Sequence, residues 1–113
     1  MSELLKLQQT FSRNVALLLL HADTLGFGVT LGEAWRSPEA AKLNAKRGTG
    51  ISNSLHIDRL AIDINLFLGD QYLPTTADHQ QLGEYWKTLH PLNRWGGEFG
   101  DGNHYSMTYQ GRK

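Results

Sequence analysis

Three short segments of the sequence concentrate side chains that can bind a divalent metal ion. They are Ser54-Leu-His56, Ala61-Ile-Asp63 and Asp101-Gly-Asn-His104. Because the chain contains no cysteine, any metal must be held by imidazole and carboxylate groups. Two histidines and one carboxylate leave a coordination position open, which is typical of catalytic rather than structural zinc. These segments are therefore the candidates for chemistry.

The spacing of these residues limits how the chain can bring them to one metal. His56 and Asp63 lie seven residues apart, which is about 10 Å along a helix and more along a strand. Since zinc bonds are about 2 Å long, the chain must bend between them, and Asp58-Arg59 supplies a polar break. We therefore expect His56 in a loop that folds back beside Asp63. Asp101 and His104 lie three residues apart, and an intervening glycine allows a tight turn that aims both at one centre.

Asp63 is the most informative of these residues. It stands between Ile62 and Ile64 on an otherwise apolar strand, where burying an acid is costly unless it is paired or bound to metal. An isolated histidine or strand aspartate is more often a surface residue or a satisfied one. Three further histidines lack comparable neighbours and receive this structural interpretation: His21, His79 and His90.

Composition places the chain among globular proteins. Its length, residues 1–113, is typical of one domain. Of these residues, 40% are hydrophobic, 19% charged and 10% aromatic. Eleven basic residues balance 11 acidic ones, so the net charge is zero and no nucleic-acid partner is expected. The lack of cysteine also excludes a disulfide framework and a cysteine nucleophile. We expect one domain and a monomer.

Targeting and membrane signals are weak. The most apolar run, Val15 to Leu20, is far shorter than the roughly 20 residues that span a membrane. Glu3 and Asp23 flank this run, and no small-residue cleavage site follows closely, so a signal peptide is not expected. The sequence thus predicts synthesis in the cytoplasm and no membrane insertion.

Hydrophobic periodicity and capping residues divide the chain into elements. The predicted helices are Ser2–Leu25, Pro38–Lys46 and Ala77–Leu89, with Ser2, Ser37 and Thr76 as caps and Gly26 as the first stop. The predicted strands are Phe27–Trp35, Ala61–Phe67 and His104–Tyr109, and Gly48 to Asn53 is a predicted surface loop. Trp95 is expected in the core, and Gly96-Gly97 in a turn that needs positive φ or close backbone approach. This order predicts an α+β fold in which a small antiparallel sheet carries the metal on one face and three helices pack on the other side or end.

Taken together, these motifs resemble one family. The run from Ser54 to Asp63, the later Trp95-Gly-Gly and the segment Asp101-Gly-Asn-His104-Tyr105 follow the pattern of the zinc D-alanyl-D-alanine carboxypeptidase family of peptidoglycan peptidases. The resemblance covers roughly residues 27–109 and looks nearest to the phage L-alanyl-D-glutamate endopeptidases. It implies the fold of DD-peptidases and hedgehog proteins. Arg59 stands where many members have glycine, so the turn before the strand must accept a side chain.

The resemblance also implies roles for individual residues. Those implied to bind Zn²⁺ are His56, Asp63 and His104. Asp101 is implied to be the general base, which takes a proton from water and later delivers it to the leaving amine. Arg36 and Ser54 match positions that help to hold the substrate, and Arg36 offers a planar fork for a carboxylate. Their plainer interpretations are a surface charge flanking a helix for Arg36 and a turn cap for Ser54.

The function implied by this resemblance is that of a zinc-dependent peptidoglycan peptidase. It would be an endolysin that hydrolyses the L-Ala-D-Glu bond of the stem peptide, acting on the wall or in the periplasm after release. An aspartate at position 101 favours this branch, because the carboxypeptidases and dipeptidases of the family have glutamate there. A D-Ala-D-Ala carboxypeptidase or dipeptidase is one alternative. A metal-binding or wall-binding module without catalysis is another, against which the presence of Asp101 argues.

Overall fold

The computed structural model describes residues 1–48 and 54–113 of the chain. Within this part, three helices and a small antiparallel sheet form the α+β fold that the sequence predicts. The helices are α1 (Glu3–Thr24), α2 (Pro38–Lys46) and α3 (Gln80–Leu89), with two 3-10 turns, η1 (Ala77–His79) and η2 (Gly96–Phe99). The strands are β1 (Gly28–Leu31), β2 (Ala61–Leu68), β3 (Gln71–Tyr72), β4 (Asn93–Trp95) and β5 (His104–Met107). The loop predicted for residues 48–53 lies, apart from its first residue, outside the described residues.

The sheet is built around β2. The first three residues of β2 pair with β5, residues 64–67 pair with β1, and its end pairs with the short β3. With β4 next to β5, the order is β1-β2-β5-β4, and every pairing is antiparallel. The register sets Asp63 directly opposite His104. Strand pairing alone therefore places two of the candidate ligands next to each other.

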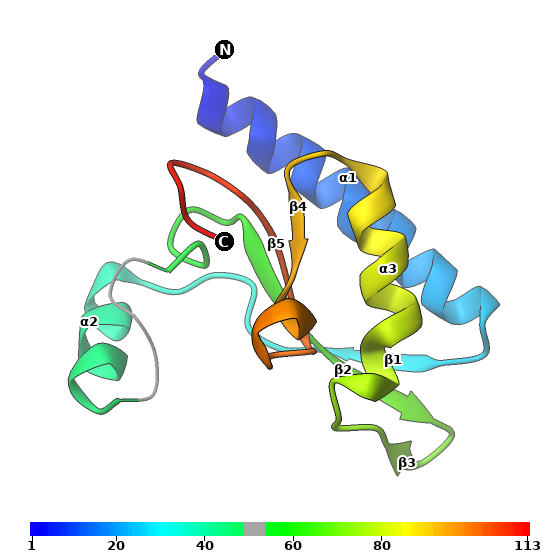
Figure 1. Cartoon of the computed structure of the whole chain (residues 1–113). Helices are drawn as coiled ribbons and strands as arrows, with labels where there is room; N and C mark the ends of the chain where they lie inside the picture. Colours follow the sequence, from blue (N-terminus) through cyan, green and yellow to red (C-terminus); the bar gives the residue numbers. More distant parts are fainter. Residues whose placement is uncertain (49–53) are drawn as a thin grey trace.

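The two faces of β2 have different surroundings. Its even-numbered residues from 62 to 66 are buried and join a core with residues of α1 and α3. The core includes Ile62, Ile64 and Leu66 of β2, Phe11 and Leu18 of α1, and Leu82 and Trp86 of α3. Figure 1 shows α1 and α3 next to each other and α2 apart from both. Because side chains alternate along a strand, Asp63 points away from this core, as the sequence predicts.

The predicted ends of the first two helices are confirmed. The Ser2 hydroxyl accepts the Leu5 backbone N–H at 3.1 Å, and the Ser37 hydroxyl accepts that of Ala40 at 3.0 Å. The chain leaves α1 through Gly26, whose φ of +88° favours glycine. Among the helices of the described ranges, none combines the length and the apolar character that crossing a bilayer requires.

The first predicted strand is too long. Regular pairing covers only β1, whereas the sequence predicts a strand over Phe27–Trp35. Beyond β1 the chain still bonds to β2, because the Asp63 N–H donates to the Glu33 carbonyl at 2.9 Å. It then turns to the segment that carries His56, where the Arg36 N–H donates to the His56 carbonyl at 3.2 Å. These contacts are made by the backbone, so the side-chain pattern does not reveal where the strand ends.

The third helix and the last strand also differ in their bounds. The predicted helix begins with η1 and becomes α-helical only at α3. Its start is fixed one residue earlier than predicted, because Thr75 and Asp78 each accept the other's backbone N–H, at 3.1 and 3.0 Å, while Thr76 makes no side-chain cap bond. β5 ends at Met107 instead of Tyr109, and β3 and β4 are too short for alternation to predict them.

We expect Gly83→Ala to destabilise the protein, although this change in a helix usually stabilises it by about 1 kcal/mol. A Cβ at Gly83 would lie 2.1 Å from the ring of Trp95, and that ring is held by a 2.7 Å hydrogen bond from its N–H to the Gly102 carbonyl. Overpacking of this kind costs about 1–3 kcal/mol in the free energy of unfolding, which denaturant titration measures. The matched control is Gly28→Ala, where the nearest atom lies 3.8 Å from the new Cβ. A Gly83→Ala protein at least as stable as the unmodified chain would contradict the expectation.

Candidate metal centre

His56 lies in a loop of successive turns that precedes β2. The Ser54 hydroxyl accepts the His56 backbone N–H at 3.1 Å, and the Leu60 N–H donates to the Leu55 carbonyl at 3.0 Å. Arg59 has a φ of 57°, in the left-handed region that favours glycine. The turn therefore places a residue with a side chain at a position that favours glycine, as the sequence predicts. The turns fold the chain back toward β2, which is the bend that the spacing of His56 and Asp63 requires.

Contacts from three other parts of the chain hold this loop. The Gln8 amide of α1 donates to the Asp58 carbonyl at 2.8 Å, and the Arg112 guanidinium forms an ion pair with the Asp58 carboxylate. The Trp35 indole N–H donates to the Ile57 carbonyl at 3.2 Å. The loop that carries His56 is thereby fixed to the N-terminal helix, to the segment after β1 and to the C-terminal segment.

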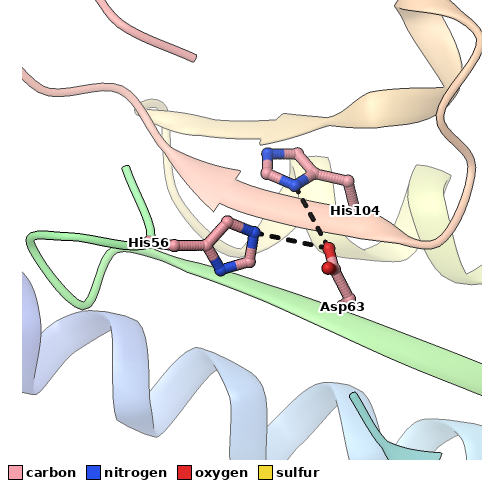
Figure 2. Close-up of side chains that lie close together, drawn as sticks. All are labelled: His56, Asp63 and His104. Carbon is pink, nitrogen blue, oxygen red and sulfur yellow. Dashed lines mark hydrogen bonds and ion pairs between the residues drawn. The ribbon is translucent and has the colours of Figure 1, made fainter. Parts of the chain in front are cut away.

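His56, Asp63 and His104 converge on one point, as Figure 2 shows. The Nε2 atom of His56 lies 3.5 Å from Oδ1 of Asp63, and Nδ1 of His104 lies 3.4 Å from the same oxygen. Both imidazoles are buried, and the carboxylate is partly exposed. Residues 41 positions apart in the sequence thus form one cluster.

The cluster is compact enough to hold one metal ion. One ligand atom from each of the three residues lies within 4.8 Å of the other two. A tetrahedral zinc ion with bonds of about 2.0–2.1 Å holds its ligand atoms about 3.3 Å apart, close to the two histidine–aspartate distances. Two nitrogen ligands and one oxygen ligand suit zinc and leave the fourth position open for water or a substrate oxygen.

The electrostatics of the cluster favour the form of Asp63 that binds metal. Burial alone would raise the pKa of its carboxyl group. Hydrogen bonds to His104 and His56, and the positive charges of these imidazoles when protonated, outweigh burial and hold the pKa of Asp63 well below its ordinary value. Asp63 is therefore a carboxylate at neutral pH.

Asp101 lies on the surface in the turn between η2 and β5. Its N–H donates to the Gly96 carbonyl at 2.8 Å, and its carbonyl accepts the His104 N–H at 3.1 Å. Gly96 is required because a Cβ there would lie 2.1 Å from the Asp101 carbonyl oxygen. Trp95 is buried beside this turn, and its N–H binds the Gly102 carbonyl. The predicted core position of Trp95 and the close backbone approach at the glycine pair are confirmed.

The two residues predicted to contact substrate have partners within the protein. The Arg36 Nε–H donates to Glu33 Oε1 at 2.7 Å, and Nη2 forms an ion pair with the same oxygen. Arg36 flanks α2, as its plainer interpretation predicts, but its side chain is only 14% exposed and is paired with Glu33. Ser54 is buried and caps the turn at His56, which confirms its plainer interpretation. Contact of either residue with substrate stays a prediction.

The sequence interpretation missed Glu33. The available signal was an acid three residues before Arg36, a spacing at which opposite charges meet on a helix. Here the segment is neither helix nor strand, and the pair forms between β1 and α2, where the backbone is bonded to Asp63 and to His56.

His79 lies next to Tyr105 in the interior of the protein. It is buried, and its Nδ1 atom lies 2.8 Å from the Tyr105 hydroxyl. Burial lowers the pKa of His79, although the nearby negative charges of Asp78 and Asp101 oppose this shift. Burial also raises the pKa of Tyr105, so that its hydroxyl keeps its proton. The structural interpretation of His79 agrees with its burial and with its contact with Tyr105.

Comparisons with known proteins bear on the fold. No protein-family model matches the sequence, and no curated protein matches it. Among solved structures, the crystal structure of the L-Ala D-Glu endopeptidase ChiX of Serratia marcescens is similar, with a TM-score of 0.74 and 18% sequence identity. The alignment covers 88% of this chain and 79% of that one. The two proteins therefore share a fold.

We expect the protein to bind one zinc ion per chain, and we expect His56→Ala, Asp63→Ala and His104→Ala each to weaken binding by more than about 100-fold. Each change removes one of three ligands, and even partners behind the ligands contribute about 10–100-fold. Competition with a chromogenic chelator measures the affinity. His21→Ala is the matched control, because His21 stacks on Tyr85 between helices. Unchanged affinity in His104→Ala would show that the cluster is not the binding site.

A second expectation concerns pH and stability. Because the pKa of folded His79 is lowered from 6.5, the unfolded chain takes up a proton below pH 6.5 that the folded chain does not. This contribution to stability is therefore present above pH 6.5 and is lost as the pH falls toward the folded pKa. From pH 7.5 to 5.5, the unmodified protein should lose more unfolding free energy than His79→Gln, by at most about 1.4 kcal/mol per pH unit. Denaturant titrations at the two pH values give this difference, and equal losses would contradict it.

Proposed function

We propose that this protein is a zinc-dependent peptidoglycan peptidase that hydrolyses the L-Ala-D-Glu bond of the stem peptide. The observation that carries the proposal is the convergence of His56, Asp63 and His104 at one point. Three such ligands would leave a bound zinc ion with one open coordination position. The fold shared with an L-Ala D-Glu endopeptidase supports the choice of substrate. In this proposal the protein acts as an endolysin, and its partner is the stem peptide of the cell wall.

In the proposed chemistry the metal and the residues of the chain have separate roles. Zinc, when bound, polarises the scissile carbonyl and acidifies the attacking water. His56 and His104 bind it as neutral imidazoles, and Asp63 supplies the negative charge. Asp101 acts as the general base: its carboxylate takes the proton of the attacking water and later gives it to the leaving amine. The turn that ties the Asp101 carbonyl to the His104 N–H supports this role, because it keeps the base beside a ligand.

The proposed substrate contacts use groups near the same loop. Stem peptides carry several carboxylates, and a guanidinium fork binds carboxylates through paired hydrogen bonds. Glu33 engages two nitrogens of Arg36, so a substrate carboxylate is proposed to bind through the remaining N–H groups. Ser54 is proposed to contribute by shaping the turn at His56.

The substrate is tested by mass spectrometry of purified muropeptides incubated with the zinc-loaded protein. We expect fragments that begin at D-Glu, and we expect a chelator to abolish their formation. Release of D-Ala alone would instead identify a D-Ala-D-Ala carboxypeptidase or dipeptidase. Binding of sacculi with no cleavage at all would identify a metal- or wall-binding module.

The role of Asp101 is tested by separating metal binding from turnover. Asp101→Asn keeps the size of the side chain but cannot take up the proton, so turnover of the muropeptide should fall by about 10²–10⁴-fold while zinc content is kept. Asp70→Asn, at an exposed acid after β2, is the matched control. Loss of zinc in Asp101→Asn would make Asp101 a ligand. Full activity would place the base elsewhere, with Glu98 as the next residue to change.

A further inference from the structure

One nitrogen of His56 has no hydrogen-bond partner among the residues that the structure describes. His56 is 3% exposed, its Nε2 atom faces Asp63, and this nitrogen is its buried Nδ1 atom. A neutral imidazole that gives Nε2 to a metal carries its proton on Nδ1. A buried N–H without an acceptor costs about 1–3 kcal/mol. The site therefore calls for an acceptor behind His56.

Glu33 supplies an acceptor in the required place. Its Oε1 atom lies 3.6 Å from His56 Nδ1, slightly beyond hydrogen-bond length, so a small movement of the side chain would close the bond. It approaches the ring nitrogen opposite the one that faces Asp63. Glu33 is thus placed behind the ligand and does not point toward the proposed metal position.

The position of Glu33 is fixed from two directions. Arg36 holds the carboxylate through Nε at 2.7 Å and through the ion pair with Nη2. The Glu33 backbone carbonyl accepts the N–H of Asp63 at 2.9 Å. The Arg36 N–H in turn binds the carbonyl of His56. The segment 33–36 is therefore bonded both to β2 at Asp63 and to the loop that carries His56, and its acid has little freedom to turn away.

We propose that Glu33 is a positioning residue for His56: it accepts the Nδ1 proton, fixes the tautomer that presents Nε2, and is itself held by Arg36. This inference rests on the zinc site of the proposed function. Carboxylates that accept the second N–H of a metal-binding histidine fix the orientation of the ring and raise its basicity. Arg36 then has a structural task at the centre in addition to any contact with substrate.

The proposal is tested by zinc affinity, measured by chelator competition without any peptide substrate. Glu33→Ala should weaken zinc binding by about 10–100-fold. Glu33→Gln should lose less, because its amide oxygen still accepts a hydrogen bond but carries no charge. Glu39→Ala, an exposed acid in the first turn of α2, is the matched control and should bind zinc as the unmodified protein does. If Glu33→Ala unfolds, the nearly isosteric Glu33→Gln variant carries the test.

A second readout follows the His56 proton itself. In zinc-loaded protein labelled with ¹⁵N, NMR correlations should show His56 coordinated through Nε2 and protonated at Nδ1, with slow exchange of that proton. Exchange should be faster in Glu33→Ala. Coordination through Nδ1, or the same affinity and exchange rate in Glu33→Ala, would overturn the proposal.

The two measurements also separate this inference from the proposed function. If Glu33 supports zinc binding but no muropeptide is cleaved, the proposed function fails and the role of Glu33 stands. If muropeptides are cleaved and Glu33→Ala binds zinc normally, only the role of Glu33 fails. If the unmodified protein binds no zinc, both the proposed function and the role of Glu33 fail.

Discussion

The Asp63 carboxylate lies on β2 and is enclosed between two imidazoles. Its position constrains most of the structure. Because side chains alternate along a strand, a shift of one residue in the pairing of β2 would turn Asp63 into the apolar core and bring Ile62 or Ile64 out of it. The pairing with β5 sets His104 opposite the acid and excludes that shift. One register thus satisfies both the core between β2 and the helices and the polar cluster on the other face.

The remaining groups reach this centre through turns, and the turns are held by packing against rigid parts of the protein. Trp95 binds the Gly102 carbonyl and lies against α3, so the segment from η2 to β5 has a fixed path. Gly102 lies against Thr76 so closely that a Cβ would be 2.5 Å from the Thr76 Cα atom. The polar site therefore depends on a tryptophan and glycines that carry no reactive groups. Such residues explain why loops can hold side chains at the separations that metal binding needs.

The sequence predicts features that depend on local chemistry or on strong patterns. The serine caps of α1 and α2 and the alternation along β2 are of this kind, and so is the need for a bend between His56 and Asp63. The end of β1 and the start of the third helix were missed because backbone contacts with distant segments and a reciprocal cap decide them. Glu33 was missed for a related reason. Its side chain reaches the site only because the chain after β1 comes next to His56, and no local pattern encodes that contact. The resemblance in motifs did select the three residues that the structure brings together.

Gln8 in α1 and Arg112 near the last residue both bind Asp58, two positions after His56. Native proteins open locally in cooperative segments. Since α1 and the segment around Arg112 are both tied to the loop that carries His56, opening of either segment loosens that loop as well. The loop, the start of α1 and the C-terminal segment then belong to one cooperative unit, and slow amide exchange near residues 8 and 112 reports on the order of a cluster that lies far from them in the sequence.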